Sequence, residues 1–265
     1  MATATLSRGM LRSEWTKLRS VRSSVWSLVA MVVLALGITV LVTSLYTANW
    51  DDPQAGERRA EALADPVGLI LQPSSLYAQI AVCVLGVMVI ASEYSTGMIR
   101  SSLLAVPRRT PVLAAKAVVF AGVIFVVTEI VAFGSFAVGR AIVHEHLPIS
   151  LGDPGVPRAI VGFGLYLALM GLFALALGAL IRHTAGAITL TLVFVLFISM
   201  ITQLLPGSVG RHIDAYMPSN AGIQIMASGN DPTKLLSPWQ GLGVLCLWVV
   251  VLLTAAGYLL NRRDA

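Results

Sequence analysis

The chain has 265 residues, of which 57% are hydrophobic and only 12% are charged, and its formal net charge is +5. Because a soluble domain has about 25% charged residues, this composition excludes an ordinary soluble protein. The apolar residues form long blocks with basic residues at their ends, which indicates a membrane protein rather than a nucleic-acid-binding one. We therefore predict an all-α integral membrane protein.

Residues 7–24 are predicted to form an amphipathic helix that lies along the membrane surface. At 100° per residue, one arc of this helix is apolar and carries Trp15, and three arginines lie beside it. The apolar arc consists of Met10, Leu11, Trp15, Leu18, Val21 and Val25, and the arginines are Arg8, Arg12 and Arg19. Glu14 falls inside the apolar arc. Either it pairs locally with Lys17, or it meets a basic residue of a partner protein.

Six apolar blocks follow, each close to the roughly 20 residues that cross a bilayer as a helix. They cover residues 25–46, 76–92, 112–136, 160–181, 184–205 and 239–260. The long connection 206–238 has apolar pieces between prolines and glycines. It is a possible re-entrant outer segment between the fifth and sixth spans, built of short half-helices.

The basic residues predict the orientation of these spans. With both termini in the cytoplasm, 12 of the 18 lysines and arginines fall on the inner side, and five acidic residues between positions 51 and 65 fall on the outer side. Positive charge concentrates on the cytoplasmic side of membrane proteins. The sequence therefore predicts a multi-pass protein of the cell membrane with both termini in the cytoplasm.

Motifs of catalysis are missing from the sequence. There is no GxxxxGK[ST] phosphate loop, no HExxH and no GxSxG, so we predict neither an ATPase nor a hydrolase. The run His144-Glu145-His146 favours a solvated loop over a metal site, because two histidines on a loop are weak evidence for metal binding. Cys83 and Cys246 are expected to be buried free thiols.

Glu129 is the one acidic residue deep inside an expected span. A carboxylate at this depth is costly, so it either lines a substrate path or ion site, or forms a hydrogen bond between helices. The expected span 160–181 also carries small residues at Gly164, Ala168, Ala174 and Gly178. These let another helix approach closely, either within the chain or in a dimer.

Five short segments in order resemble the permease subunits of ABC transporters of the ABC-2 type, especially small six-span actinobacterial ones. They are SEWTKLRSVRSSVW at 13–26, SEYSTGMIRSSLLAVPRR at 92–109, ALGALIRHTAGAI at 176–188, YMPSNAG at 216–222 and NRRDA at 261–265. The first is similar to the family's elbow helix, and the second is similar to its cytoplasmic coupling helix. The resemblance covers nearly the whole chain and implies a single permease domain.

The resemblance implies a transmembrane permease subunit of an ATP-driven exporter. A second permease chain, identical or different, would complete the substrate path, and separate ATPase subunits would bind ATP and Mg, so no cofactor is expected in this chain. The coupling segment 93–106 and the elbow helix would contact the ATPase. The expected contact residues are Glu93, Tyr94, Gly97, Met98, Ile99 and Arg100, with Glu14, Trp15 and Lys17 in support.

Two other functions remain open on the sequence. One is an ion-coupled secondary transporter that uses Glu129, although no inverted repeat is visible. The other is a membrane scaffold protein that transports nothing. Apolar span interiors with one buried carboxylate would suit an amphiphile, lipid, peptide or drug as substrate.

Overall fold

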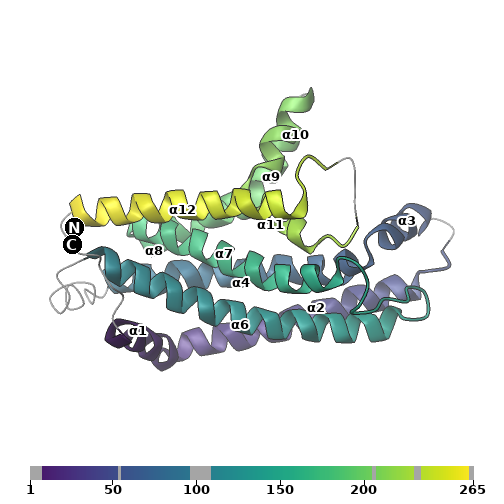
Figure 1. The fold of residues 1–265 in the computed structure, drawn as a ribbon, viewed down its shortest axis with the longest axis horizontal. Helices are drawn as coiled ribbons and strands as arrows, with labels where there is room; N and C mark the ends of the chain where they lie inside the picture. Colours follow the sequence, from purple (N-terminus) through teal and green to yellow (C-terminus); the bar gives the residue numbers. More distant parts are fainter. Residues whose placement is uncertain (1–7, 53–54, 96–108, 205–206, 230–233, 263–265) are drawn as a thin grey trace.

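The computed structural model describes residues 8–52, 55–95, 109–204, 207–229 and 234–262, and within these residues it contains helices and no strand. Five long helices lie side by side along one axis (Figure 1). They are α2 (Arg22–Ala48), α4 (Pro66–Ser95), α6 (Arg109–Val143), α7 (Val156–Ile181) and α12 (Pro238–Arg262). By length and apolar composition, each of the five can cross a membrane. The part of the chain that the structure describes is thus an all-helical membrane protein.

Helix α7 is the centre of the bundle and is the most buried of the five spans. Its glycines let its neighbours approach closely. A Cβ added at Gly86 of α4 would lie 2.5 Å from the carbonyl oxygen of Gly171, and one at Gly178 would lie 2.7 Å from Ile90. The small residues of α7 therefore pack within the chain, which is the first of the two explanations that the sequence left open.

The amphipathic helix at the start of the chain is present as α1 (Arg8–Ser20). Val21 has extended backbone angles, with φ −83° and ψ 102°, and separates α1 from α2. Because of this break α1 does not continue along α2, and it packs instead beside the first turns of α6 (Figure 1).

Helix α4 begins ten residues before the predicted start of its span, at Pro66 instead of residue 76. The added turns contain two serines and Pro73 near the predicted start, and the two serine hydroxyl groups bond within the helix. Ser74 donates to the carbonyl of Leu71, and Ser75 donates to that of Gln72. This local pairing removes the cost of burying a hydroxyl, so the helix continues through Pro73 and its neighbours.

The predicted continuous span 184–205 differs most from the structure. It consists of α8 (Thr184–Leu192), the π-helical η2 (Val193–Phe197) and α9 (Ile198–Gln203). Its apolar stretch Thr184–Phe197, which covers α8 and η2, is shorter than the five long helices. The π-helical turn interrupts the regular hydrogen-bond ladder. After it the chain leaves the bundle, and α10 (Gly207–Ala215) projects from the other helices (Figure 1). The described residues thus show five long apolar helices, whereas the sequence predicted six.

The connection before α12 contains the predicted short helices, α11 (Pro218–Ile223) and η3 (Gln224–Met226). Three buried polar side chains attach α11 to the bundle. Tyr166 donates to the side-chain carbonyl of Gln79 at 2.6 Å, and the Gln79 amide donates to Ser219 at 3.0 Å. Gly241, one turn into α12, packs against the backbone of Ala221. This segment therefore folds back against the bundle, and α3 (Gly56–Ala64) lies near the same end (Figure 1).

The opposite end of the bundle brings together α1, the last turn of α4 and the first turns of α6. The last turns of α7 and α12 join them there. The guanidinium of Arg182, just after α7, lies over the ring of Tyr94 at 5.1 Å. A Cβ added at Gly257 of α12 would lie 3.5 Å from Thr110 of α6. A cluster of charged side chains lies at this end.

Candidate functional site

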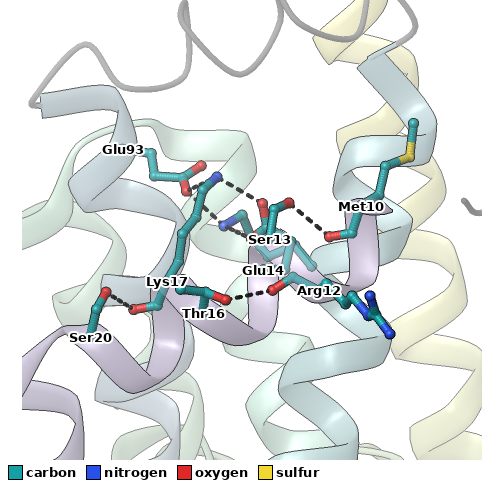
Figure 2. Close-up of polar contacts among 9 residues, drawn as sticks. Met10, Arg12, Ser13, Glu14, Thr16, Lys17, Ser20 and Glu93 are labelled. Carbon is teal, nitrogen blue, oxygen red and sulfur yellow. Dashed lines mark hydrogen bonds and ion pairs between the residues drawn. The ribbon is translucent and has the colours of Figure 1, made fainter. Parts of the chain in front are cut away.

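Four charged side chains from three helices form one ion-pair cluster at this end of the bundle (Figure 2). The cluster consists of Glu14 and Lys17 on α1, Glu93 on α4 and Lys116 on α6. The Lys116 amine lies 2.6 Å from Oε2 of Glu14 and 2.9 Å from Oε1 of Glu93. The Lys17 amine lies 2.7 Å from Oε1 of Glu14 and 3.1 Å from Oε1 of Glu93. Each amine therefore joins both carboxylates.

Helical spacing puts these groups together. Glu14 and Lys17 are three residues apart and lie on the same face of α1. Glu93 is in the last turn of α4, and Lys116 is two turns into α6. Glu14, Glu93 and Lys116 are only 4%, 3% and 3% exposed. The cluster is thus an internal joint between helices rather than a charged surface.

The charges within the cluster stabilise one another. Burial alone would raise the pKa of the Glu14 carboxyl, but Lys116 and Lys17 outweigh this effect and hold the pKa below its ordinary value of 4.5. Burial alone would lower the pKa of the Lys17 amine, but Glu14 and Glu93 raise it above 10.5. At neutral pH both groups therefore stay charged and paired.

The cluster joins α1 to both ends of the segment 96–108. Helix α4 ends at Ser95 and α6 begins at Arg109, so Glu93 and Lys116 hold the two helices that this segment connects. One oxygen of Glu93, Oε2, is buried and has no hydrogen-bond partner among the described residues. Among the described residues, the end of α4 therefore has one carboxylate oxygen without a partner.

The structure places the predicted site residues unequally. Glu14, Lys17 and Glu93 come together, and Tyr94 contacts Arg182 beside them. Trp15 is 52% exposed and faces α6 instead of the cluster. The remaining predicted contact residues lie outside the described part of the chain; they are Gly97, Met98, Ile99 and Arg100.

Lys116 was not among the predicted site residues. The local pair of Glu14 with Lys17 is present, but Glu14 also pairs with this lysine from a helix 102 residues away. The sequence held one signal for it, a lysine inside an apolar block. A charge at such a position needs a buried partner.

Glu129 forms a second, isolated polar site on α6. Neither of its carboxylate oxygens has a hydrogen-bond partner among the described residues. The carboxyl group packs against Gly164 of α7, where an added Cβ would lie 2.8 Å from its carboxyl carbon. The hydrogen bond between helices that the sequence suggested is therefore not seen in the described part of the chain.

The histidine run 144–146 forms no cluster of ligands. The ring of His146 stacks on Trp50 with ring centroids 4.7 Å apart, and His144 Nδ1 lies 2.8 Å from the carbonyl of Ala141. Among the described residues, no group of three or more possible metal ligands occurs.

The family follows from comparison with known proteins. The family model of the ABC-2 family transporter protein matches residues 10–199, which is more than half of the chain. The chain belongs to the ABC-2 transporter family. A search of curated proteins found no match to it. The matched range of this ABC-2 family protein contains all four residues of the ion-pair cluster as well as Glu129, and it ends before α10.

Membership confirms the resemblance that the sequence showed. This ABC-2 family protein is a multi-pass membrane protein of the permease type, with five helices that can each cross the bilayer.

Proposed function

We propose that this chain is the transmembrane permease subunit of an ATP-driven exporter and is driven by separate ATPase subunits through the segment 93–106. A second permease chain completes the substrate path, and ATP and Mg are bound by the ATPase subunits. The observation that carries this proposal is the ion-pair cluster, because it ties α1 to both helices that the segment connects.

The cluster determines which helices a force on this segment would move. A force on residues 96–108 acts on the end of α4 and the start of α6, and Lys116 binds both to α1 through Glu93 and Glu14. Buried ion pairs hold a fixed geometry, and breaking one leaves an uncompensated charge in the protein interior. The three helices therefore move as one body when the segment is pushed.

The structure also supports two different roles for the proposed contact residues, positioning of the coupling segment and direct contact with the ATPase. Glu14 and Glu93 are buried and paired with lysines of their own chain, so they position the coupling segment, and Lys17 and Tyr94 assist them. Direct contact with the ATPase then falls to Gly97, Met98, Ile99 and Arg100. These four residues occupy the centre of the motif that resembles the coupling helix.

The proposal includes a sixth membrane crossing. Helix α7 ends at the cluster end of the bundle, and α12 begins at the other end (Figure 1). Between them, α8, η2 and α9 supply 20 residues, and a straight helix of that length would span about 30 Å. Both termini then lie on the cytoplasmic side, as the distribution of basic residues predicts.

The test is to purify the tagged chain from its native membranes and to measure the ATP hydrolysis that is purified with it. The proposal predicts a bound ATPase subunit. Arg100→Glu and Gly97→Pro should lower the bound activity or separate it from transport, because they alter the contact segment. Arg211→Glu, at an exposed arginine of α10, is the matched charge reversal and should leave the activity unchanged. Full coupled transport by both segment variants would refute the assignment.

Glu129 favours one second candidate, an ion-coupled transporter. Its two oxygens, which have no partner among the described residues, provide an acceptor for a proton or cation inside the bundle. In proteoliposomes that contain the chain alone, this candidate predicts a proton flux driven by a pH gradient that Glu129→Gln abolishes. A flux no greater than that of empty liposomes would exclude it.

A further inference from the structure

An apolar groove lies between α1 and α6, on a different face of α1 from the ion-pair cluster. Its volume is about 560 Å³. Leu11, Arg12 and Trp15 line it from α1, and a row of valines around Gly122 lines it from α6. The groove is therefore hydrocarbon-like along its length and carries one positive charge.

The groove opens toward the lipid rather than toward the rest of the bundle. The valines at its two ends, Val118 and Val126, are 54% and 58% exposed although they belong to a membrane-spanning helix. Only 33% of the α6 span is buried inside the protein. Lipid is the solvent of such a surface, so an acyl chain is the group available to fill the groove.

Arg12 places a positive charge beside this apolar surface, which favours an anionic group on the molecule that binds there. Figure 2 shows its guanidinium pointing away from Lys17 and Glu93. The guanidinium makes no hydrogen bond or ion pair with the described residues, unlike the lysines of the cluster. Arg8 and Arg19 are exposed on the same flank of α1. An unpaired guanidinium at the head of an apolar groove is complementary to a phosphate attached to an acyl chain.

We propose that this groove binds one anionic phospholipid of the inner leaflet, with an acyl chain along the valines of α6 and the phosphate at Arg12. Trp15 also lines the groove, and indole rings are favoured at membrane interfaces. The lipid would then pack against α1 beside the ion-pair cluster. This site goes beyond the proposed transport function and does not depend on an ATPase partner.

Two substitutions separate the charge from the groove. Arg12→Gln removes the phosphate contact. Gly122→Leu adds an apolar side chain to the groove, at a position where a Cβ meets nothing within 4 Å. The controls are Arg19→Gln, on the same flank but outside the groove, and Gly37→Leu, at an equally open glycine of α2.

The experiment is native mass spectrometry of the purified full chain in detergent with equal amounts of phosphatidylglycerol and phosphatidylcholine of identical acyl chains. We expect one retained phosphatidylglycerol per chain and little phosphatidylcholine. Arg12→Gln should lower phosphatidylglycerol retention about fivefold, which is the effect of one basic residue near an anionic membrane surface. Gly122→Leu should lower the retention of both lipids, and the two controls should match the unmodified chain.

Equal retention of the two lipids by the unmodified chain would overturn the proposal. So would phosphatidylglycerol retention that neither Arg12→Gln nor Gly122→Leu reduces. A groove that binds a protein segment instead of lipid would give this second result. A glycerol phosphate without acyl chains, added as a competitor, should not displace the lipid, and displacement would show that the charge alone accounts for binding.

Discussion

At the scale of single residues, Lys116 is the centre of the ion-pair cluster. It is the one cluster member on α6, and it bonds a carboxylate from each of the other two helices. Neither carboxylate is exposed to water that could replace it. The stability of the ion-pair cluster therefore depends on Lys116 more than on the partly exposed Lys17.

Lys116→Met should destabilise the protein strongly, because the buried carboxylates of Glu14 and Glu93 would then have only the amine of Lys17 as an ion-pair partner within the cluster. Breaking a buried ion pair in this way costs about 3–5 kcal/mol. Thermal unfolding of the purified protein measures the effect. Lys234→Met, at an exposed lysine near the other end, should change the unfolding midpoint little. Equal effects of the two substitutions would show that the joint contributes no stability.

The pH dependence of the joint follows from the pKa shifts of Glu14 and Lys17. The pKa of Glu14 is lowered in the folded protein, so its stabilisation is present above pH 4.5 and is lost as the pH falls through the lower, folded value. The pKa of Lys17 is raised, so its stabilisation is present below pH 10.5 and is lost as the pH rises through the folded value. The joint should thus hold constant strength between these two values.

Unfolding midpoints across pH test this expectation. The difference between the unmodified chain and Glu14→Gln should be constant at intermediate pH and should shrink below pH 4.5. A difference that already shrinks near neutral pH would contradict the pairing of Glu14 with the two lysines.

The sequence predicted half of this joint. The spacing of Glu14 and Lys17 predicted a local pair, because helical geometry relates residues three apart. The pairing of Glu14 with Lys116 has no periodic signal, since it depends on how α1 turns at Val21 and packs against α6. The sequence also could not predict that the Glu129 carboxylate lacks a partner among the described residues, because it does not show which side of α6 meets Gly164.

At the scale of elements, the contact of α4 with α7 holds the bundle together. The backbones meet at Gly86 and Gly171, where an added Cβ would lie 2.5 Å from a carbonyl oxygen. A backbone atom cannot rotate away as a side chain can, so the helices must separate to admit even a methyl group.

Gly86→Ala should therefore destabilise the protein by about 1–3 kcal/mol, as overpacking of a filled interior does. Gly243→Ala is the matched control, because a Cβ at that glycine of α12 meets nothing within 4 Å. It should be neutral or stabilising by up to about 1 kcal/mol, the helix preference of alanine over glycine. Thermal unfolding in detergent compares them, and equal midpoints would show that α4 and α7 do not pack this closely.

The sequence predicted most long elements but misjudged two. Apolar block length was enough to place α2, α6, α7 and α12, because a span must be both long and apolar. The start of α4 was missed because Ser74 and Ser75 are polar in the sequence but bond to their own helix. The π-helical turn at Val193–Phe197 was missed because no proline or glycine within it signals a break.

At the scale of the whole molecule, the orientation in the membrane rests on one connection. Residue His183 lies at the cluster end, and Lys234 lies beside Glu61 and Asp65 near the other end. If α8, η2 and α9 together cross the bilayer, these two residues lie on opposite sides of the membrane. The even number of crossings then returns α12 to the cytoplasm.

Cysteine labelling tests this topology in intact cells. With Cys83 and Cys246 replaced by alanine, Lys234→Cys should react with a membrane-impermeant maleimide, and His183→Cys should react only after the cells are permeabilised. Both positions are exposed, so access to the reagent depends on the side of the membrane. Labelling of both in intact cells, or of neither, would contradict a crossing between them.

For the whole molecule, the central proposal is that the ion-pair cluster transmits force from the coupling segment to α1, α4 and α6. The most direct test exchanges the two charges of its shortest contact between helices, Glu14→Lys and Lys116→Glu, singly and together, and measures the ATP hydrolysis that is purified with the tagged chain. We predict that each single reversal lowers this activity and that the double exchange recovers only part of it. Opposite charges again face each other across α1 and α6, but each reversed charge then lies beside a like charge, Lys17 or Glu93. Full activity in both well-folded single variants would contradict the account.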